Sequence, residues 1–135
     1  MSVFDTLRIA GSGLTAQRLR MDVAASNIAN AGTSHTPAGG PYQPESVWFE
    51  ATQMGTSMSQ TGVTAAALPT PNTTPKVVYD PRDPNADADG FVRMPDVDIA
   101  AQMADLMGSA RSYSMNATVV SAAKQNALDA LELGR

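Results

Sequence analysis

The segment NADADGFVRMPD, residues 85–96, spaces its oxygen-bearing side chains like the ligands of a calcium loop. An EF-hand loop carries ligands at positions 1, 3, 5 and 12 and a glycine at position 6. Counted from the first residue, those positions hold Asn85, Asp87, Asp89, Asp96 and Gly90. Calcium binding is therefore the chemistry that this spacing offers.

The residues around this segment do not favour an EF-hand, because such a loop lies between two helices. Pro81 and Pro84 precede the segment and Pro95 lies inside it, and proline interrupts helices. Asp and Asn side chains also hydrogen-bond to the backbone two residues further on, and Gly90 can adopt the positive φ of such a turn. We predict a metal-free turn followed by a short strand; a soluble calcium-binding module is the alternative.

No set of side chains is typical of an enzyme. His35 is the sole histidine and lies in a turn-rich stretch, where a solvated residue is expected. Ser12 lies in a helical pattern and not in a strand–turn–helix nucleophile elbow. The chain has no cysteine, which excludes disulfides, thiolate metal sites and a cysteine nucleophile. We expect no catalytic residues, no cofactor and no metal ion.

The composition argues against nucleic-acid and membrane partners. The 135 residues include only 9 Lys and Arg, spread along the chain, and the net charge is −4, whereas nucleic-acid binders show a basic face. No apolar run approaches the roughly 18 residues of a membrane span, so no direct membrane insertion is expected. The first 20 residues lack a positive start followed by an apolar block, so no cleaved signal peptide is expected either.

The distribution of proline divides the chain into three parts. All 9 prolines lie between Pro37 and Pro95, so only the two ends can form long helices. We predict an N-terminal helix over residues 1–31, a loop and small β-rich insert over 32–97, and a C-terminal helix over 98–135. Asp96 or Asp98 is expected to cap the last helix, and Gly134 is expected to end it.

Apolar residues recur at alternating steps of four and three in both terminal segments, which is the a/d seam of a coiled coil. The first seam comprises Val3, Leu7, Ala10, Leu14, Gln17, Met21, Ala24, Ile28 and Ala31. The second comprises Ile99, Met103, Leu106, Ala110, Tyr113, Ala117, Val120, Lys124, Ala127 and Leu131. We therefore predict an α+β fold whose terminal helices pair as an antiparallel coiled-coil-like hairpin.

Further apolar residues lie outside both seams and also need partners. They are Ile9, Leu19, Val23, Met107, Met115, Val119, Leu128 and Leu133. One helical hairpin cannot cover both faces of both helices, and the alanines of the seams bury little area. The sequence therefore predicts an assembly in which neighbouring copies cover each subunit's helices.

The β-rich insert contains four short strand candidates. Residues 46–52 and 75–81 are rich in β-branched and aromatic residues and are bounded by proline, and 62–68 and 90–94 are weaker candidates. A four-stranded patch of this size is marginal alone. It is expected to lean on the helices or on neighbouring molecules.

Two stretches resemble the rod and hook proteins of the bacterial flagellum, the flagellar axial protein family. The first is SGLTAQRLRMDVAASNIANAGT (12–33), with the signature SNIANAGT. The second runs from residue 83 to the end and carries DADGFV, PDV and the A-R-x-Y-x-x-N run of Ala110 to Asn116. The chain departs from the family pattern at two places. AGTSHTPAGGPY replaces the family's N-T-P-G-Y, and Gln102 replaces a common Glu. The short length is similar to that of the proximal-rod members.

The resemblance implies a structural subunit of the proximal rod, part of the drive shaft that transmits torque from motor to hook. It implies a place in the basal body, in a rod that spans the periplasm, and export by the flagellar type III system without a cleaved signal. Implied partners are copies of the chain, other rod proteins (FlgB and the distal rod proteins), and the export apparatus with its adaptor at the rod base. The alternative is a subunit of another exported filament or needle.

From the seams and the signature we expect assembly contacts at a set of helix residues. They are Leu7, Leu14, Met21, Asn27, Ile28, Asn30, Met103, Leu106, Ala110, Arg111, Tyr113, Asn116, Val120 and Leu131.

Overall fold

The computed structural model describes residues 2–55 and 60–133 as two long helices with four strands between them. The order along the chain is α1 (Val3–Ala29), β1 (Glu45–Gln53), β2 (Thr61–Pro69), β3 (Lys76–Tyr79), β4 (Phe91–Met94) and α2 (Ile99–Leu133). This order confirms an α+β fold with a helix at each end of the chain. All four strand candidates are confirmed.

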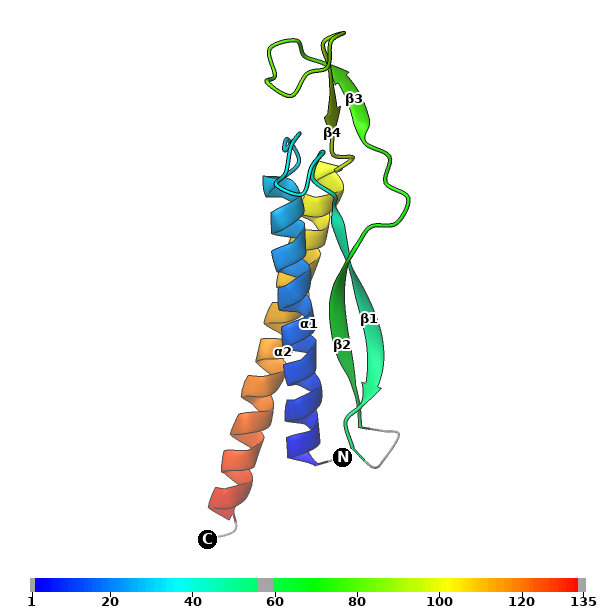
Figure 1. The fold of residues 1–135 in the computed structure, drawn as a ribbon. Coiled ribbons are helices and arrows are strands. Elements are labelled where there is room, and N and C mark those ends of the chain that lie inside the picture. Colours follow the sequence, from blue (N-terminus) through cyan, green and yellow to red (C-terminus); the bar gives the residue numbers. More distant parts are fainter. Residues whose placement is uncertain (1, 56–59, 134–135) are drawn as a thin grey trace.

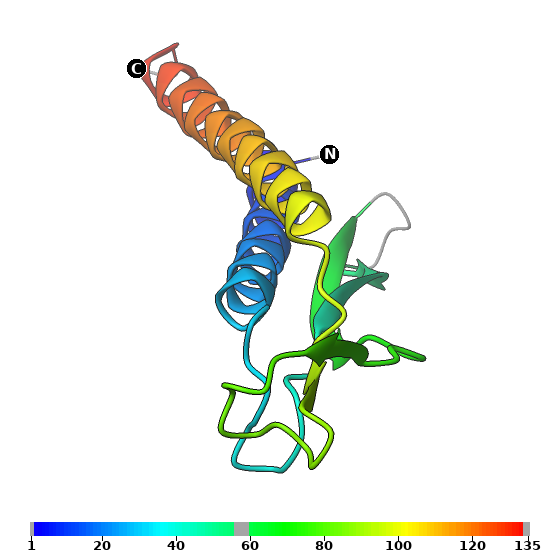
Figure 2. The same ribbon diagram turned by 90° about the horizontal axis from the view of Figure 1, so that it is seen from above.

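The two helices lie side by side and run in opposite directions (Figure 1). With 35 residues against 27 for α1, α2 extends past the start of α1, and from above the two helices diverge toward the C-terminus (Figure 2). The last turns of α2 therefore have no α1 beside them.

Side chains at the helix ends define where each helix begins. Ser2 and Asp5 form a capping box at the start of α1. The hydrogen bond from the Ser2 backbone N–H lowers the pKa of the Asp5 carboxyl, and Arg8 adds to this effect. At α2, the Oδ1 atom of Asp98 accepts hydrogen bonds from the N–H groups of Ala100 and Ala101, at 3.0 and 3.2 Å. Asp98, and not Asp96, is thus the cap.

The predicted end of the first helix is wrong by two residues. The helix stops at Ala29 instead of residue 31, and Asn30 is its C-cap. Asn30 turns the chain locally, because its Nδ2 donates to the Ser26 carbonyl at 2.9 Å and its Oδ1 accepts from the Thr33 hydroxyl at 3.2 Å. The predicted stop of the last helix at Gly134 lies outside the described residues.

The strands form two separate antiparallel pairs, so the prediction of one four-stranded patch is wrong. β1 pairs with β2 from Glu45–Pro69 to Gln53–Thr61, and β3 pairs with β4 from Lys76–Met94 to Tyr79–Phe91. The β1–β2 hairpin runs beside α1, while β3 and β4 lie beyond the ends of the helices where α1 stops and α2 starts (Figure 1). Each pair is too small to be stable alone in water.

The first helix packs against three other elements and the second against one. α1 packs against α2 on one side and against β1 and β2 on the other, whereas α2 packs on α1 and on no strand within the described ranges. The buried apolar residues are few and small: Ala10, Ala16, Val23, Ala24, Val92 and Ala123. Val23, which lies outside the predicted seam of α1, is therefore covered within the chain by the β1–β2 hairpin.

The seam predicted on α2 is wrong as an intrachain seam over much of its length. Met103, Ala110 and Lys124 are exposed, and Leu131 keeps 71% of its surface. The buried and half-buried positions of α2 are mostly polar or small: Gln102, Asp105, Ser109, Ser112, Asn116 and Ala123, together with Leu106, Ala117, Val120 and Ala127 of the predicted seam. Hydrophobic periodicity failed here because the apolar side of the helix is not the side that α1 covers.

Two glycines allow the close approach of neighbouring elements. A Cβ atom on Gly13 would lie 2.9 Å from the Nδ2 atom of Asn116, where α2 crosses α1. A Cβ atom on Gly62 would lie 2.8 Å from the Ser12 hydroxyl, and that hydroxyl accepts a hydrogen bond from the Val63 N–H at 3.1 Å. The helix continues through Gly11 and Gly13 without a break.

Gln17 is a local misfit between the packed elements. Its Oε1 atom is buried and lacks a hydrogen-bond partner among the described residues. An unsatisfied buried acceptor destabilises a fold, and an apolar group of the same shape avoids that cost. We expect Gln17→Met to raise the free energy of unfolding of the isolated chain by about 1 kcal/mol, measured by urea denaturation.

A matched control for this substitution is Gln125→Met on α2, where the glutamine is exposed and donates to Asp129 at 2.7 Å. That change should leave the free energy of unfolding the same or lower it. A loss of stability in Gln17→Met would show that the amide is satisfied in solution.

Candidate assembly surfaces

Large apolar side chains are concentrated on the outer surface of α2. Met107 keeps 72% of its surface, Met115 57% and Met103 54%. Ile99, Tyr113, Val119, Leu128, Leu131 and Leu133 are exposed as well. On α1, by contrast, the large apolar residues exposed among those described are Val3 and Phe4 at its very start. A continuous run of exposed apolar residues along a helix marks an interaction surface.

Asn27 joins three elements at the end of the helix pair. Its Nδ2 donates to the Glu45 carbonyl at 2.7 Å and to the Gln102 side chain at 3.0 Å. Its Oδ1 accepts from the Tyr42 hydroxyl and from the Glu45 N–H, both at 3.0 Å. The side chain keeps 1% of its surface and has both donors and both acceptor sites in use. Asn27 therefore fixes where β1 and α2 start relative to the end of α1.

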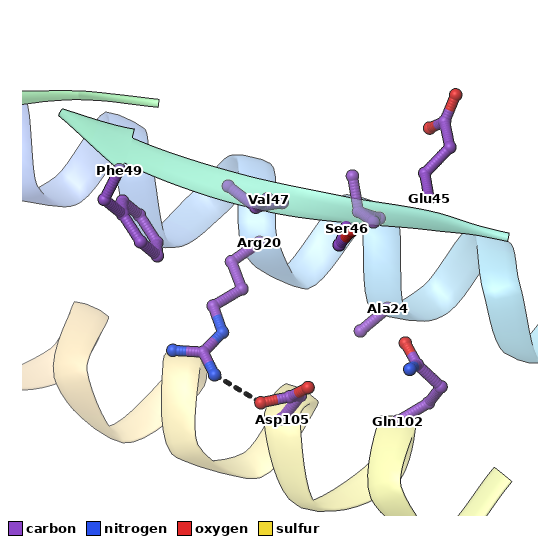
Figure 3. A pocket seen from close by; sticks show the side chains of 9 residues that line it. Arg20, Ala24, Glu45, Ser46, Val47, Phe49, Gln102 and Asp105 are labelled. Carbon is purple, nitrogen blue, oxygen red and sulfur yellow. Dashed lines mark hydrogen bonds and ion pairs between the residues drawn. The ribbon is translucent and has the colours of Figure 1, made fainter. Parts of the chain in front are cut away.

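A hollow of about 300 Å³ lies between α1, β1 and α2, lined by residues that include Arg20, Phe49 and Asp105 (Figure 3). Arg20 forms an ion pair with Asp105 across the helices, and its guanidinium carbon lies 6.0 Å from the centre of the Phe49 ring. Both charged side chains are about two-fifths exposed. A half-exposed pair of this kind contributes little energy, but it is the one charged contact between α1 and α2 among the described residues.

The segment that resembles a calcium loop is a set of turns. Oδ1 of Asp87 accepts from the N–H groups of Asp89 and Phe91, at 3.0 and 2.8 Å, and Gly90 has a φ of +83°. Asp96, the would-be last ligand, instead pairs with Lys76 at 2.6 Å, and this contact raises the pKa of the Lys76 amine. These contacts confirm the prediction of a turn followed by a strand.

The outer face of the β1–β2 hairpin carries a second apolar surface. Side chains alternate between faces along a strand, so Trp48 and Glu50 share the face that points away from α1. The register places Ala66 opposite Trp48, and Leu68 lies on the same face. Trp48 keeps 60% of its surface and Leu68 48%. The sequence analysis missed this surface, although the alternation around Trp48 could have indicated it.

Comparison with known proteins identifies the kind of assembly. Residues 7–34 match the family model described as "Flagella basal body rod protein", and residues 88–133 match "Flagellar basal body rod FlgEFG protein C-terminal". The flagellar basal-body rod protein FlgC of Salmonella typhimurium is 38% identical over 135 residues, which is 100% of both chains. The chain belongs to the FlgC family.

More distant FlgC proteins agree along the whole chain. The Bacillus subtilis protein is 36% identical over 100% of both chains, and the Aquifex aeolicus protein is 36% identical over 93% of this chain and 92% of its own. FlgC proteins are structural subunits of the flagellar basal-body rod and not enzymes. Within the described ranges, neither helix combines the length and the hydropathy that a membrane crossing requires.

The residues expected to form assembly contacts of this chain fall into three groups. Asn27 is buried, and Leu7, Leu14, Met21, Ile28, Asn30, Leu106, Asn116 and Val120 are half-buried. Met103, Ala110, Arg111, Tyr113 and Leu131 are exposed. The exposed group lies entirely on α2, whereas every residue of the set on or next to α1 is buried or half-buried. The exposed surface of each side chain decides whether that residue is available for contact with a neighbouring subunit.

Proposed function

We propose that this chain is a subunit of the proximal rod, part of the drive shaft between motor and hook, and that α2 is its main contact with neighbouring subunits. The observation that carries the proposal is the exposed apolar surface of α2, which packs only on α1 among the described elements, whereas α1 packs on α2, β1 and β2. A rod that transmits torque needs every subunit fixed to several neighbours. The exposed surface of α2 offers such contacts without unfolding the chain.

The predicted coiled-coil-like contacts then form between copies of the chain. Tyr113 and Leu131 of the predicted seam keep 38 and 71% of their surface, and Val119 and Leu128 outside it keep 44 and 45%. A seam with steps of three and four suits helix–helix packing. We propose that the C-terminal half of α2 packs in this way against helices of neighbouring subunits. The division into residues 1–31, 32–97 and 98–135 then separates the helical layer from the β-rich layer.

We also propose which proteins surround this chain and where it is located. The neighbours are copies of this chain, FlgB and the distal rod proteins, with the export apparatus and its adaptor at the rod base. The rod spans the periplasm, and the chain reaches it through the flagellar type III apparatus without a cleaved signal. The membership in the FlgC family supports this assignment.

Deletion of the gene, followed by electron microscopy of purified basal bodies, tests this function. We expect membrane rings without a complete rod, no hook and no swimming, and full restoration when the chain is supplied from a plasmid. Complete rods and hooks in the deletion strain would contradict the proposal.

A further inference from the structure

The β1–β2 hairpin has one covered face and one open face. α1 covers the inner face, where Val63, Ala65 and Ala67 are half-buried. The outer face presents Trp48, Leu68 and Ala66 to solvent, and Glu50 beside them is the only charged side chain on it. A two-stranded hairpin needs packing on its apolar surface to be stable. A second helix on the outer face would supply that packing in the same way as α1 does inside.

The chain itself carries an unpartnered helix surface of matching chemistry. Ile99, Met103 and Met107 follow one another at one-turn spacing on α2 and are exposed by 48, 54 and 72%. Arg111, one turn further on, is exposed. Methionine side chains are flexible and pack well against aromatic rings. This line, Ile99–Met103–Met107–Arg111, combines an apolar stretch with a single positive charge.

We propose that the line Ile99–Met103–Met107–Arg111 of one copy docks on the hairpin outer face of the next copy, with Arg111 paired to Glu50 and Met107 against Trp48. The proposal rests on the proposed role as a rod subunit. It names two different surfaces of the same chain, so the contact is head-to-tail, and repeated head-to-tail contacts generate an open helical assembly when the rotation between copies does not close into a ring.

The spacing and direction of the two surfaces agree. Trp48 and Glu50 lie two residues apart on a strand, about 6.6 Å, and Met107 and Arg111 lie four residues apart on a helix, about 6 Å. The match requires the docked helix to run in the same direction as β1. In one chain, β1 and α2 both run away from the β3–β4 end (Figure 1). The docked copy therefore keeps the same orientation along the axis, as a rod with two distinct ends requires.

Charge reversal tests the pairing in cells that lack their own copy. We expect Glu50→Arg and Arg111→Glu each to reduce the amount of chain in purified basal bodies about ten-fold or more. The double variant should restore it. Lys124→Glu, an exposed charge elsewhere on α2, is the matched control and should not restore Glu50→Arg. Wild-type incorporation of both single variants, or no restoration in the double variant, would overturn the pairing.

The absence of cysteine allows a direct test of the contact. A chain with Trp48→Cys and Met107→Cys, treated with a short bis-maleimide in purified basal bodies, should give a ladder of multimers. The Trp48→Cys chain alone should give none. A doubly substituted chain that is incorporated without forming the ladder would overturn this docking while leaving the function as a rod subunit intact.

Discussion

Asn27→Ala is expected to lower the free energy of unfolding of the isolated chain by about 2–4 kcal/mol. The reason is that both backbone groups of Glu45 and the Gln102 side chain lose a partner and the Tyr42 hydroxyl keeps only its contact with Ser26, and each buried group left unsatisfied costs about 1–3 kcal/mol. The apolar core consists of a few small residues, so this loss is a large fraction of the stability. Urea denaturation followed by circular dichroism measures it.

Asn126→Ala is the matched control, because Asn126 is an exposed asparagine on α2. Alanine is a better helix former than asparagine, so this variant should be as stable as the parent chain or slightly more stable. Equal stability of Asn27→Ala and the parent chain would show that the Asn27 contacts do not hold the three elements together.

Met107→Asp is expected to abolish swimming while leaving the isolated chain folded. Met107 keeps 72% of its surface, and exposed substitutions change the free energy of unfolding by less than about 0.5 kcal/mol. In the assembled rod the carboxylate would be buried without a partner, which is strongly unfavourable. The readouts are soft-agar motility, the amount of chain in purified basal bodies and the denaturation curve of the isolated chain.

Met107→Leu keeps the size and the apolar character and should swim normally. If Met107→Asp swims as well as the parent, the outer surface of α2 at this position faces solvent in the rod. If Met107→Asp instead unfolds the isolated chain, the exposure of Met107 does not describe the free subunit.

Sequence reasoning succeeded where local chemistry decides the structure. The proline distribution placed both helices, and the Asp and Asn residues before Gly90 indicated a turn, which the hydrogen bonds of Asp87 confirm. The excess of apolar residues on α2 was also predicted, and Met107, Met115 and Leu133 are exposed. These features depend on short stretches of chain.

Sequence reasoning failed where the choice of partner decides the structure. The period of three and four on α2 is real, but many of its large apolar residues are exposed, while Ser109, Ser112 and Asn116 are buried or half-buried. A periodic pattern cannot distinguish an intrachain seam from an intermolecular one. The four strands could likewise be located, but their separation into two pairs depends on α1 covering only β1 and β2. The role of Asn27 was visible only as part of the family signature.

We expect neighbouring subunits to cover the outer surface of α2 in the rod. Maleimide labelling of Met107→Cys, Met115→Cys and Leu128→Cys tests it, because the chain has no cysteine of its own. The parent chain, without cysteine, gives the background labelling. Denatured basal bodies give the maximum labelling at each position. We expect rapid labelling of all three positions in the isolated chain and strong protection in intact purified basal bodies. Equally rapid labelling in both states would show that the outer surface of α2 stays open to solvent in the rod.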